Sequence, residues 1–189
     1  MPLPRSVEPQ LAKLVEKAPT GPQWVHDIKF DDYRLGARIE RGKVQLLTRC
    51  GLDWMAEYPA TAAAFARLAV KRGYIDGELC GVRADGVTSF ELMQQSSDAG
   101  YGGLIHFAFD LLEFDGEDVV KLPLLERKER LARLLKDPPA GIVYSEHEGG
   151  DGEGFRRGGL SAWAGGRRVQ AGRPALSAGR PRRVGQEQV

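Results

Sequence analysis

The chain has 189 residues, of which 42% are hydrophobic and 28% charged, and its formal net charge is +1. This length is typical of one domain, since domains usually contain about 100–200 residues, and the composition is that of an ordinary soluble globular protein. A net charge near zero gives no indication that the whole chain attracts nucleic acid. The amino-terminal segment has no continuous apolar run, which argues against a signal peptide or a membrane span, and we expect a cytoplasmic protein.

The cysteines and histidines do not form a metal-binding pattern. Cys50 and Cys80 lack the short spacing of a zinc site. The three histidines, at positions 26, 106 and 147, are scattered among the expected strands. We therefore expect reduced cysteines without a metal, as is usual in the cytoplasm.

The first half of the chain predicts one helix, three strands and a second helix. Residues 7–17 have the period of a short amphipathic helix. Strands are expected over residues 24–30, 33–40 and 43–47, and the turn at Arg41-Gly42 joins the last two. A helix is expected over residues 59–68, because proline is favoured in the first turn of a helix.

The second half continues the alternation of strands and helices. A strand is expected over residues 73–82, a short helix over 90–95 and a continuous apolar strand of the buried type over 105–112. Leucines at helical spacing predict a helix over residues 124–135, which ends before Pro138-Pro139, and residues 142–146 are expected to form another strand. Strands joined by short turns, with helices between them, predict an α+β domain of mainly antiparallel sheets.

The segment from Lys29 to Arg34 gives the clearest indication of chemistry. Lys29 follows an apolar run, and Asp31 lies two residues after it. In a strand these two side chains share a face. A partly desolvated lysine near other cations can lose its proton near neutral pH and act as a nucleophile. Taken alone, the same spacing also fits a surface lysine in a charged hairpin.

This segment resembles the adenylation motif of ATP-dependent DNA ligases, whose core is lysine-any-aspartate-glycine-any-arginine. Five further segments resemble other motifs of the family in the same order, at residues 7–12, 47–54, 75–79, 107–112 and 122–128. The resemblance extends to about residue 153 and is to the ligase domain of the bacterial multifunctional non-homologous end-joining ligases. It implies that residues 1–155 form a partial adenylation domain with the nucleotidyltransferase (ATP-grasp-like) fold, incomplete at its carboxyl end.

The resemblance also implies a reaction and its participants. Lys29 would attack the α-phosphate of ATP, expel pyrophosphate and hold AMP, with Mg²⁺ or Mn²⁺ as cofactor. The AMP would then serve to seal nicks in DNA repair and recombination. The implied partners are nicked or broken double-stranded DNA and end-joining repair proteins, in the bacterial cytosol or nucleoid.

The same resemblance implies a nucleotide site at Asp27, Ile28, Lys29, Arg34, Arg49, Glu78 and Phe109. Arg34 and Arg49 would contact ribose and phosphate as planar donors and favour the neutral amine of Lys29. Glu78 would accept hydrogen bonds from the ribose hydroxyls or help to hold the metal ion. Phe109 would stack on adenine. Asp27 stands where the family usually has the glutamate that reads the adenine amino group.

The chain departs from the family pattern at two positions near this site. Asp32 replaces a glycine, so that it adds a Cβ and a negative charge near the phosphates; this would raise the pKa of Lys29 and repel ATP. Cys50 replaces the usual asparagine, at little expected cost.

Residues 156–189 differ in character from the rest of the chain, being rich in Gly, Arg, Ala and Pro without a period. The simplest interpretation is a disordered basic arm, which would bind nucleic acid. We favour a shift of reading frame near residues 155–158. Residues 165–170 and 184–189 can be written with codons that, read one base later, spell EGVVSK and WVKSK, the two motifs that a ligase still requires. We therefore expect an out-of-frame, disordered tail, and a truncated domain that is impaired or inactive.

Three other interpretations remain open at this point. Ordinary structural roles would be a surface salt bridge for Arg49, a strand-end carboxylate for Glu78 and a core position for Phe109. The chain could belong to another group of covalent nucleotidyltransferases, such as RNA ligases or capping enzymes. It could also be a non-catalytic ligase fragment, either a pseudogene product or a nucleotide-binding remnant.

Overall fold

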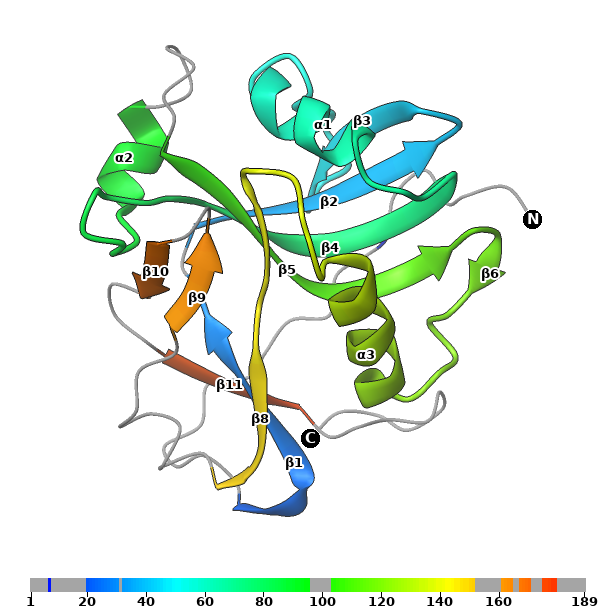
Figure 1. Cartoon of the computed structure of the whole chain (residues 1–189), viewed down its shortest axis with the longest axis vertical. Helices are drawn as coiled ribbons and strands as arrows, with labels where there is room; N and C mark the ends of the chain where they lie inside the picture. The colour runs from blue at the N-terminus through cyan, green and yellow to red at the C-terminus, as the bar shows by residue number, and fades with distance from the viewer. Residues whose placement is uncertain are drawn as a thin grey trace.

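The computed structural model describes residues 7, 20–30, 32–95, 103–151, 161–164, 167–170 and 175–179. The helix expected over residues 7–17 lies outside this part of the chain, except for Val7. In the described part, the strands form a main sheet, a second sheet of three strands and a pair of short strands, as Figure 1 shows.

The main sheet has the order β3-β2-β4-β5-β6, and β7 pairs with β5 outside this path. Its strands are β2 (Tyr33–Glu40), β3 (Lys43–Thr48), β4 (Arg72–Gly81), β5 (Leu104–Phe114), β6 (Glu117–Asp118) and β7 (Ile142–Tyr144). Neighbouring strands are antiparallel, apart from the parallel pair of β5 and β7. The α+β class and the mainly antiparallel pairing predicted from the sequence are therefore confirmed.

The turn predicted between β2 and β3 is also confirmed. Arg41 and Gly42 have φ angles of 51° and 78°. Two consecutive residues with positive φ match the twist of the flanking strands and allow a hairpin with a two-residue loop.

Among the described residues, three helices border the main sheet: α1 (Pro59–Ala66), α2 (Phe90–Gln95) and α3 (Leu124–Leu134). Their apolar side chains pack with one face of the sheet, and each large side chain that is fully buried contributes about 1.5–3 kcal/mol. The largest members of this core are Leu35, Ile39, Leu46, Phe65, Ile75, Leu79, Met93, Leu111, Leu131 and Ile142. Because successive side chains of a strand alternate between faces, Arg34, Asp76 and Glu78 lie on the other face of the sheet.

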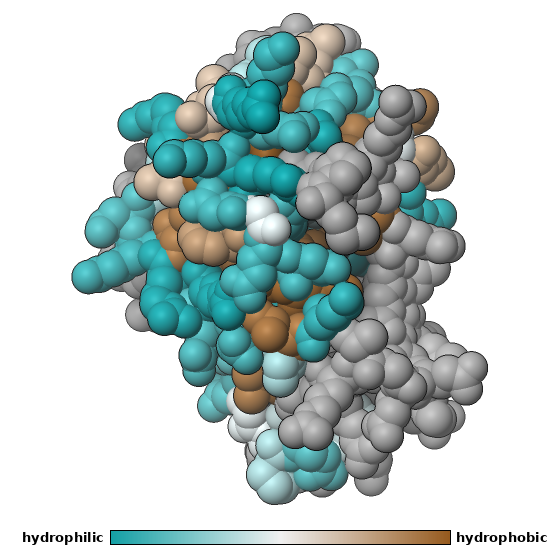
Figure 2. Space-filling model, turned by 90° about the vertical axis from the view of Figure 1, so that its right-hand side faces the viewer, coloured by the Kyte–Doolittle hydropathy of each residue, from teal (hydrophilic) through white to brown (hydrophobic). Residues whose placement is uncertain are grey.

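The outer surface around α3 and β6 is mainly polar. Figure 2 shows small apolar areas there, separated by hydrophilic side chains. Among the described residues, no helix has the length and apolarity needed to cross a membrane.

The second sheet has the order β11-β1-β8 and consists of β1 (Thr20–Lys29), β8 (His147–Asp151) and β11 (Ala175–Gly179). The end of β1 joins the main sheet through a small apolar cluster. In this cluster Ile28 and Phe30 pack with Cys80, Phe107 and Val143. The Phe30 and Phe107 rings stack with their centroids 4.3 Å apart. This packing places the carboxyl end of β1 beside the polar face of the main sheet.

Within residues 156–189, for which the sequence predicted no packed structure, the described residues form three strands. Strand β11 pairs with β1, and β9 (Ser161–Ala164) pairs with β10 (Arg167–Gln170). The amino-acid composition of the segment did not indicate these strands. Pairing at a sheet edge uses backbone N–H and C=O groups, which every composition supplies. The expected disorder of the segment and its origin in another reading frame both stay predictions.

Candidate functional site

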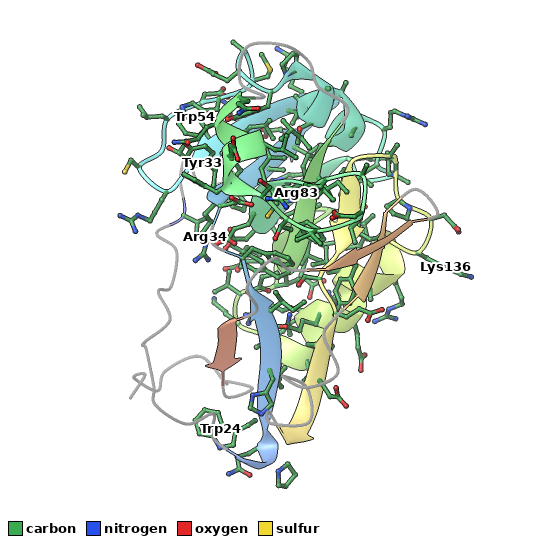
Figure 3. The ribbon with its side chains drawn as sticks, turned by 90° about the vertical axis from the view of Figure 1, so that its left-hand side faces the viewer. Trp24, Tyr33, Arg34, Trp54, Arg83 and Lys136 are labelled. Carbon is green, nitrogen blue, oxygen red and sulfur yellow. The ribbon has the colours of Figure 1, made fainter. Side chains whose placement is uncertain are left out.

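The candidate site is centred on Arg34, where the polar face of the main sheet meets the end of β1. Figure 3 shows Arg34 near the upper end of β1, at about the middle of the molecule, and Trp24 near the lower end of the same strand. Arg34 Nε and Nη2 donate to Asp76 Oδ1 and Oδ2, at 3.2 and 2.5 Å. Burial lowers the pKa of the Arg34 guanidinium, but the hydrogen bond and charge of Asp76 outweigh it, so that the pKa is raised. Arg34 is thus held as a fixed cation.

Phe109 lies under this cation. The Arg34 Cζ atom is 5.2 Å from the centroid of the Phe109 ring, a cation–π arrangement. Phe109 is half-buried, whereas Phe107 on the same strand is buried and stacks on Phe30. Of these two phenylalanines, Phe107 therefore takes the core role, and Phe109 keeps surface that a flat ligand can contact.

Glu78 lies next to Arg34 in the main sheet. The two residues are direct partners across β2 and β4. The half-buried Glu78 carboxylate contributes to the raised pKa of Arg34, after the larger effects of burial and Asp76. The preceding Gly77 is required by packing, since a Cβ atom there would collide with the His106 ring and the Phe107 carbonyl oxygen. The absence of a side chain at Gly77 therefore allows β4 to approach β5 closely.

Asp27 is bound to a lysine that the sequence did not assign to the site. Lys128 Nζ donates to Asp27 Oδ1 at 2.9 Å and to the Phe109 carbonyl oxygen at 3.0 Å. Burial raises the pKa of Asp27, and the charge and hydrogen bond of Lys128 oppose that rise. One signal was present in the sequence: Lys128 takes a core position in the leucine pattern of its helix, between Leu124 and Leu131.

The other residues that were predicted to belong to the nucleotide site differ in their burial. The side chain of Ile28 is buried in the apolar cluster, so only its backbone can face a nucleotide. Lys29 is the last residue of β1, with Ala175 as its partner across β11, and its side chain lies outside the described part. Arg49 is exposed in the turn after β3, and it lines a small hollow together with Arg34 and Asp76.

Asp27, Arg34, Glu78 and Phe109 are therefore brought together, with Arg49 at the margin. The two carboxylates of this group, those of Asp27 and Glu78, do not by themselves form a metal centre. Among the described residues, no group of three or more His, Cys, Asp or Glu side chains is arranged to hold a metal ion.

The family model of the ATP dependent DNA ligase domain matches residues 4–153 of the chain. The chain belongs to this family. The match covers every residue that the sequence assigned to the site, and the family predicted from the motifs is confirmed.

Curated relatives of this ligase-domain chain include multifunctional end-joining proteins. The multifunctional non-homologous end joining protein LigD of Pseudomonas aeruginosa is 40% identical over 136 residues, which are 71% of this chain and 16% of that protein. LigD of Mycobacterium tuberculosis is 36% identical over 113 residues, which are 59% of this chain and 14% of that protein. The chain thus spans a small part of the length of these relatives.

Solved ligase domains share the fold of this chain. The crystal structure of the ligase domain from M. tuberculosis LigD has a TM-score of 0.65 at 28% identity, covering 84% of this chain and 54% of that one. A mycobacterial DNA ligase D complexed with ATP and MES has a TM-score of 0.63 at 24% identity, covering 80% of this chain and 55% of that one. The nucleotidyltransferase fold class predicted from the sequence is confirmed by these likenesses.

Asp32, at the position of the ligase-motif glycine, is half-buried beside Cys80. Burial raises the pKa of the Asp32 carboxyl, and a hydrogen bond with the Cys80 thiol opposes the rise. Burial and the charge of Asp32 in turn raise the pKa of the Cys80 thiol. The carboxyl group thus contacts the Cys80 thiol, and its expected effect on the phosphates of a bound nucleotide stays a prediction.

A buried histidine lies behind Gly77 and supports the sheet under the site. The His106 ring is completely buried, with Nε2 2.9 Å from the Leu35 carbonyl oxygen and the Phe65 ring packed edge-on at 4.9 Å. Burial lowers the pKa of His106 to about 4. The imidazole is therefore neutral at pH 7, and Nε2–H donates to the carbonyl.

Proposed function

We propose that this domain binds ATP and transfers AMP to its own Lys29. A bond forms between Lys29 Nζ and the α-phosphorus, the bond to the bridging oxygen breaks, pyrophosphate leaves with that electron pair, and the amine loses its proton to solvent. The observation that carries the proposal is the ligase-domain match over residues 4–153, which includes Lys29 at the end of β1 and the cluster of Arg34, Glu78 and Phe109 beside it.

The chain's own residues supply position and charge. Phosphoryl transfer depends mainly on alignment and on stabilisation of developing negative charge. Arg34, fixed by Asp76, is a cation that needs no reorganisation when the nucleotide arrives, and Arg49 adds a second at the margin. The Phe109 ring gives the base a flat apolar surface on one side. Asp27 offers a carboxylate oxygen to a donor on the edge of the base.

We also propose that Mg²⁺ or Mn²⁺ accompanies ATP. Mg²⁺ usually binds through one or two carboxylates together with substrate phosphates. A single half-buried carboxylate beside Arg34 fits this requirement, and Glu78 would supply it. When bound, the ion would neutralise charge on the phosphates.

The subsequent substrate in this proposal is broken or nicked double-stranded DNA. Support comes from the family and from the names of the LigD relatives, which refer to non-homologous end joining. The AMP would pass to a 5′-phosphate before the strands are joined, in DNA repair and recombination and with end-joining proteins as partners. Since that substrate lies in the bacterial nucleoid, the domain would act in the cytoplasm.

We propose further that residues 156–189 come from a shifted reading frame. The family match ends at residue 153, close to the point where the composition changes. The codon argument for the two missing motifs is independent of that boundary. DNA sequencing across codons 153–158 tests the proposal, and an intact frame with codons that do not spell the motifs would refute it.

A non-catalytic fragment is the second candidate function. The observation that favours it is Asp32, which takes the place of the motif glycine and lies half-buried against Cys80. A fragment of this kind would bind nucleotide without forming a covalent intermediate.

Incubation with ATP labelled at the α-phosphate and Mg²⁺, followed by denaturing electrophoresis, separates these possibilities. We expect covalent label on the chain that disappears in Lys29→Ala and persists in Lys43→Ala, which removes an exposed lysine of β3. Label that persists in Lys29→Ala would remove Lys29 from the reaction. No label on the native chain would favour the non-catalytic fragment, and label from GTP in preference to ATP would favour a capping enzyme.

A further inference from the structure

A buried lysine of α3 lies directly behind the candidate site. Lys128 Nζ reaches both the Asp27 carboxylate and the Phe109 carbonyl oxygen, at 2.9 and 3.0 Å. The lysine side chain is 1% exposed, whereas that of Asp27 is 21% exposed. Removing an ammonium group from water carries a penalty of several kcal/mol unless it is well paired. The pair is therefore asymmetric: its cation is sealed inside, and its carboxylate reaches the surface of the site.

The helix that carries Lys128 is itself fastened to β5. Arg127 Nε and Nη2 donate to the two carboxylate oxygens of Asp110, each at 2.8 Å, and Nη1 donates to the Leu122 carbonyl oxygen at 2.8 Å. A bidentate pair of this kind fixes orientation as well as distance. Two consecutive residues of α3 thus hold two consecutive residues of β5, and Lys128 extends that attachment to β1.

Lys128 consequently links two groups that stand on different sheets. Phe109 belongs to the main sheet and carries the ring under Arg34, and Asp27 belongs to the second sheet. One ammonium group bonds to both, so it limits how far the carboxylate can move relative to the backbone of the stacking residue. This is the arrangement needed when one residue must contact the face of a planar ligand and another must contact its edge.

We propose that Lys128 is a positioning residue that sets the base selectivity of the site by holding Asp27 as an ionised acceptor near Phe109. The inference rests on the proposed nucleotide-binding function and extends it to the choice of base. A carboxylate accepts a hydrogen bond from an exocyclic amino group, as on adenine, and repels a carbonyl oxygen at the same ring position, as on hypoxanthine. Once Lys128 is lost, the half-buried Asp27 protonates more readily and can donate to that carbonyl.

Calorimetric titration of the full chain with ATP and with ITP tests this role. We expect the native chain to bind ATP more tightly than ITP. In Lys128→Met the ratio of the two affinities should fall about tenfold or more, which corresponds to the loss of one hydrogen bond to a charged group. Lys128→Arg should retain most of the preference. Arg130→Met is the matched control, since Arg130 lies on the same helix but pairs at the surface with Glu117 and Glu126.

Thermal melting of each variant shows whether it folds. If Lys128→Met does not fold, Asp27→Asn takes its place, because it removes the charged acceptor and should lower the same ratio. Equal binding of ATP and ITP by the native chain, or an unchanged ratio in the folded variants, would overturn the positioning role. A lowered ratio in chains that never label Lys29 would support the positioning role and refute the proposed adenylation.

Discussion

The stability of the domain should depend on pH through His106. In the folded chain burial lowers the pKa of this imidazole to about 4. In the unfolded chain it should titrate at its ordinary value of about 6.5. As the pH falls from about 6.5 to about 4, the unfolded state binds a proton that the folded state does not, so the free energy of unfolding decreases. Above this window the contribution is fully present.

The size of the effect follows from the difference between the two pKa values. A difference of about 2.5 units, at about 1.36 kcal/mol for each unit, gives about 3 kcal/mol lost by pH 4. This is a large share of the roughly 5–15 kcal/mol by which a domain is usually stable. The free energy of unfolding should change most steeply between about pH 4.5 and 6, because this range lies between the two pKa values of His106. The slope there corresponds to the uptake of about one proton on unfolding.

Urea denaturation at a series of pH values measures this dependence. The carboxylates also titrate near pH 4, so the informative quantity is the difference between the native chain and His106→Gln, in which an amide can still donate to the Leu35 carbonyl oxygen. We expect the variant to lose the slope between pH 4.5 and 6 while keeping the slope at lower pH. Parallel curves for the two chains would show that His106 titrates normally and would refute the reasoning.

Three further predictions concern single positions. Gly77→Ala should destabilise the fold by about 1–3 kcal/mol or more in urea denaturation, because its Cβ would collide with the His106 ring and a carbonyl oxygen of β5. Arg34→Lys should lower covalent labelling by ATP about 100-fold, because the bidentate cation is lost, whereas Arg38→Ala on the same strand should label normally. Asp32→Gly should change labelling little in the present chain, and it should raise labelling once the frame after residue 155 is restored.

Each of these three predictions would be contradicted by a specific outcome. Native-like stability of Gly77→Ala would mean that β4 and β5 can separate locally at little cost. Equal loss of labelling in Arg34→Lys and Arg38→Ala would indicate a general effect of strand β2 rather than a contact with phosphate. Labelling by the present chain as fast as by the restored one would show that the downstream motifs are dispensable.

The periodic parts of the fold could be predicted from the sequence because local pattern determines them. The apolar run of β5, the leucine spacing of α3 and the Arg41-Gly42 turn each produced the element that was expected. Strand β1 begins at Thr20, earlier than its apolar run, because it pairs there with β8, which is far away in the sequence. The strands of residues 161–179 likewise depend on partners that no local pattern indicates.

The candidate site was predictable only where a motif marks it. The motif identified Arg34 and Phe109, but it could not show that Asp76 would fix the guanidinium or that the two side chains would stack. Lys128 was missed for the same reason, since its partner Asp27 is 101 residues away. The orientation of Asp32 toward Cys80 also depends on tertiary packing rather than on spacing.

The division of the site between two sheets has a consequence for folding and ligand response. Lys29 and Asp27 belong to the sheet of β1, whereas Arg34 and Glu78 belong to the main sheet. The contacts that dock the end of β1 on the main sheet, such as those of Ile28 with Phe107 and Val143, join residues far apart in the sequence and form late, because a large loop must close first. A nucleotide that contacts both sheets would bind only when the sheet of β1 is packed against the main sheet. Its binding free energy would therefore stabilise that packing. Protection of β1 amides from hydrogen exchange should then rise with nucleotide concentration, while that of β4 stays constant.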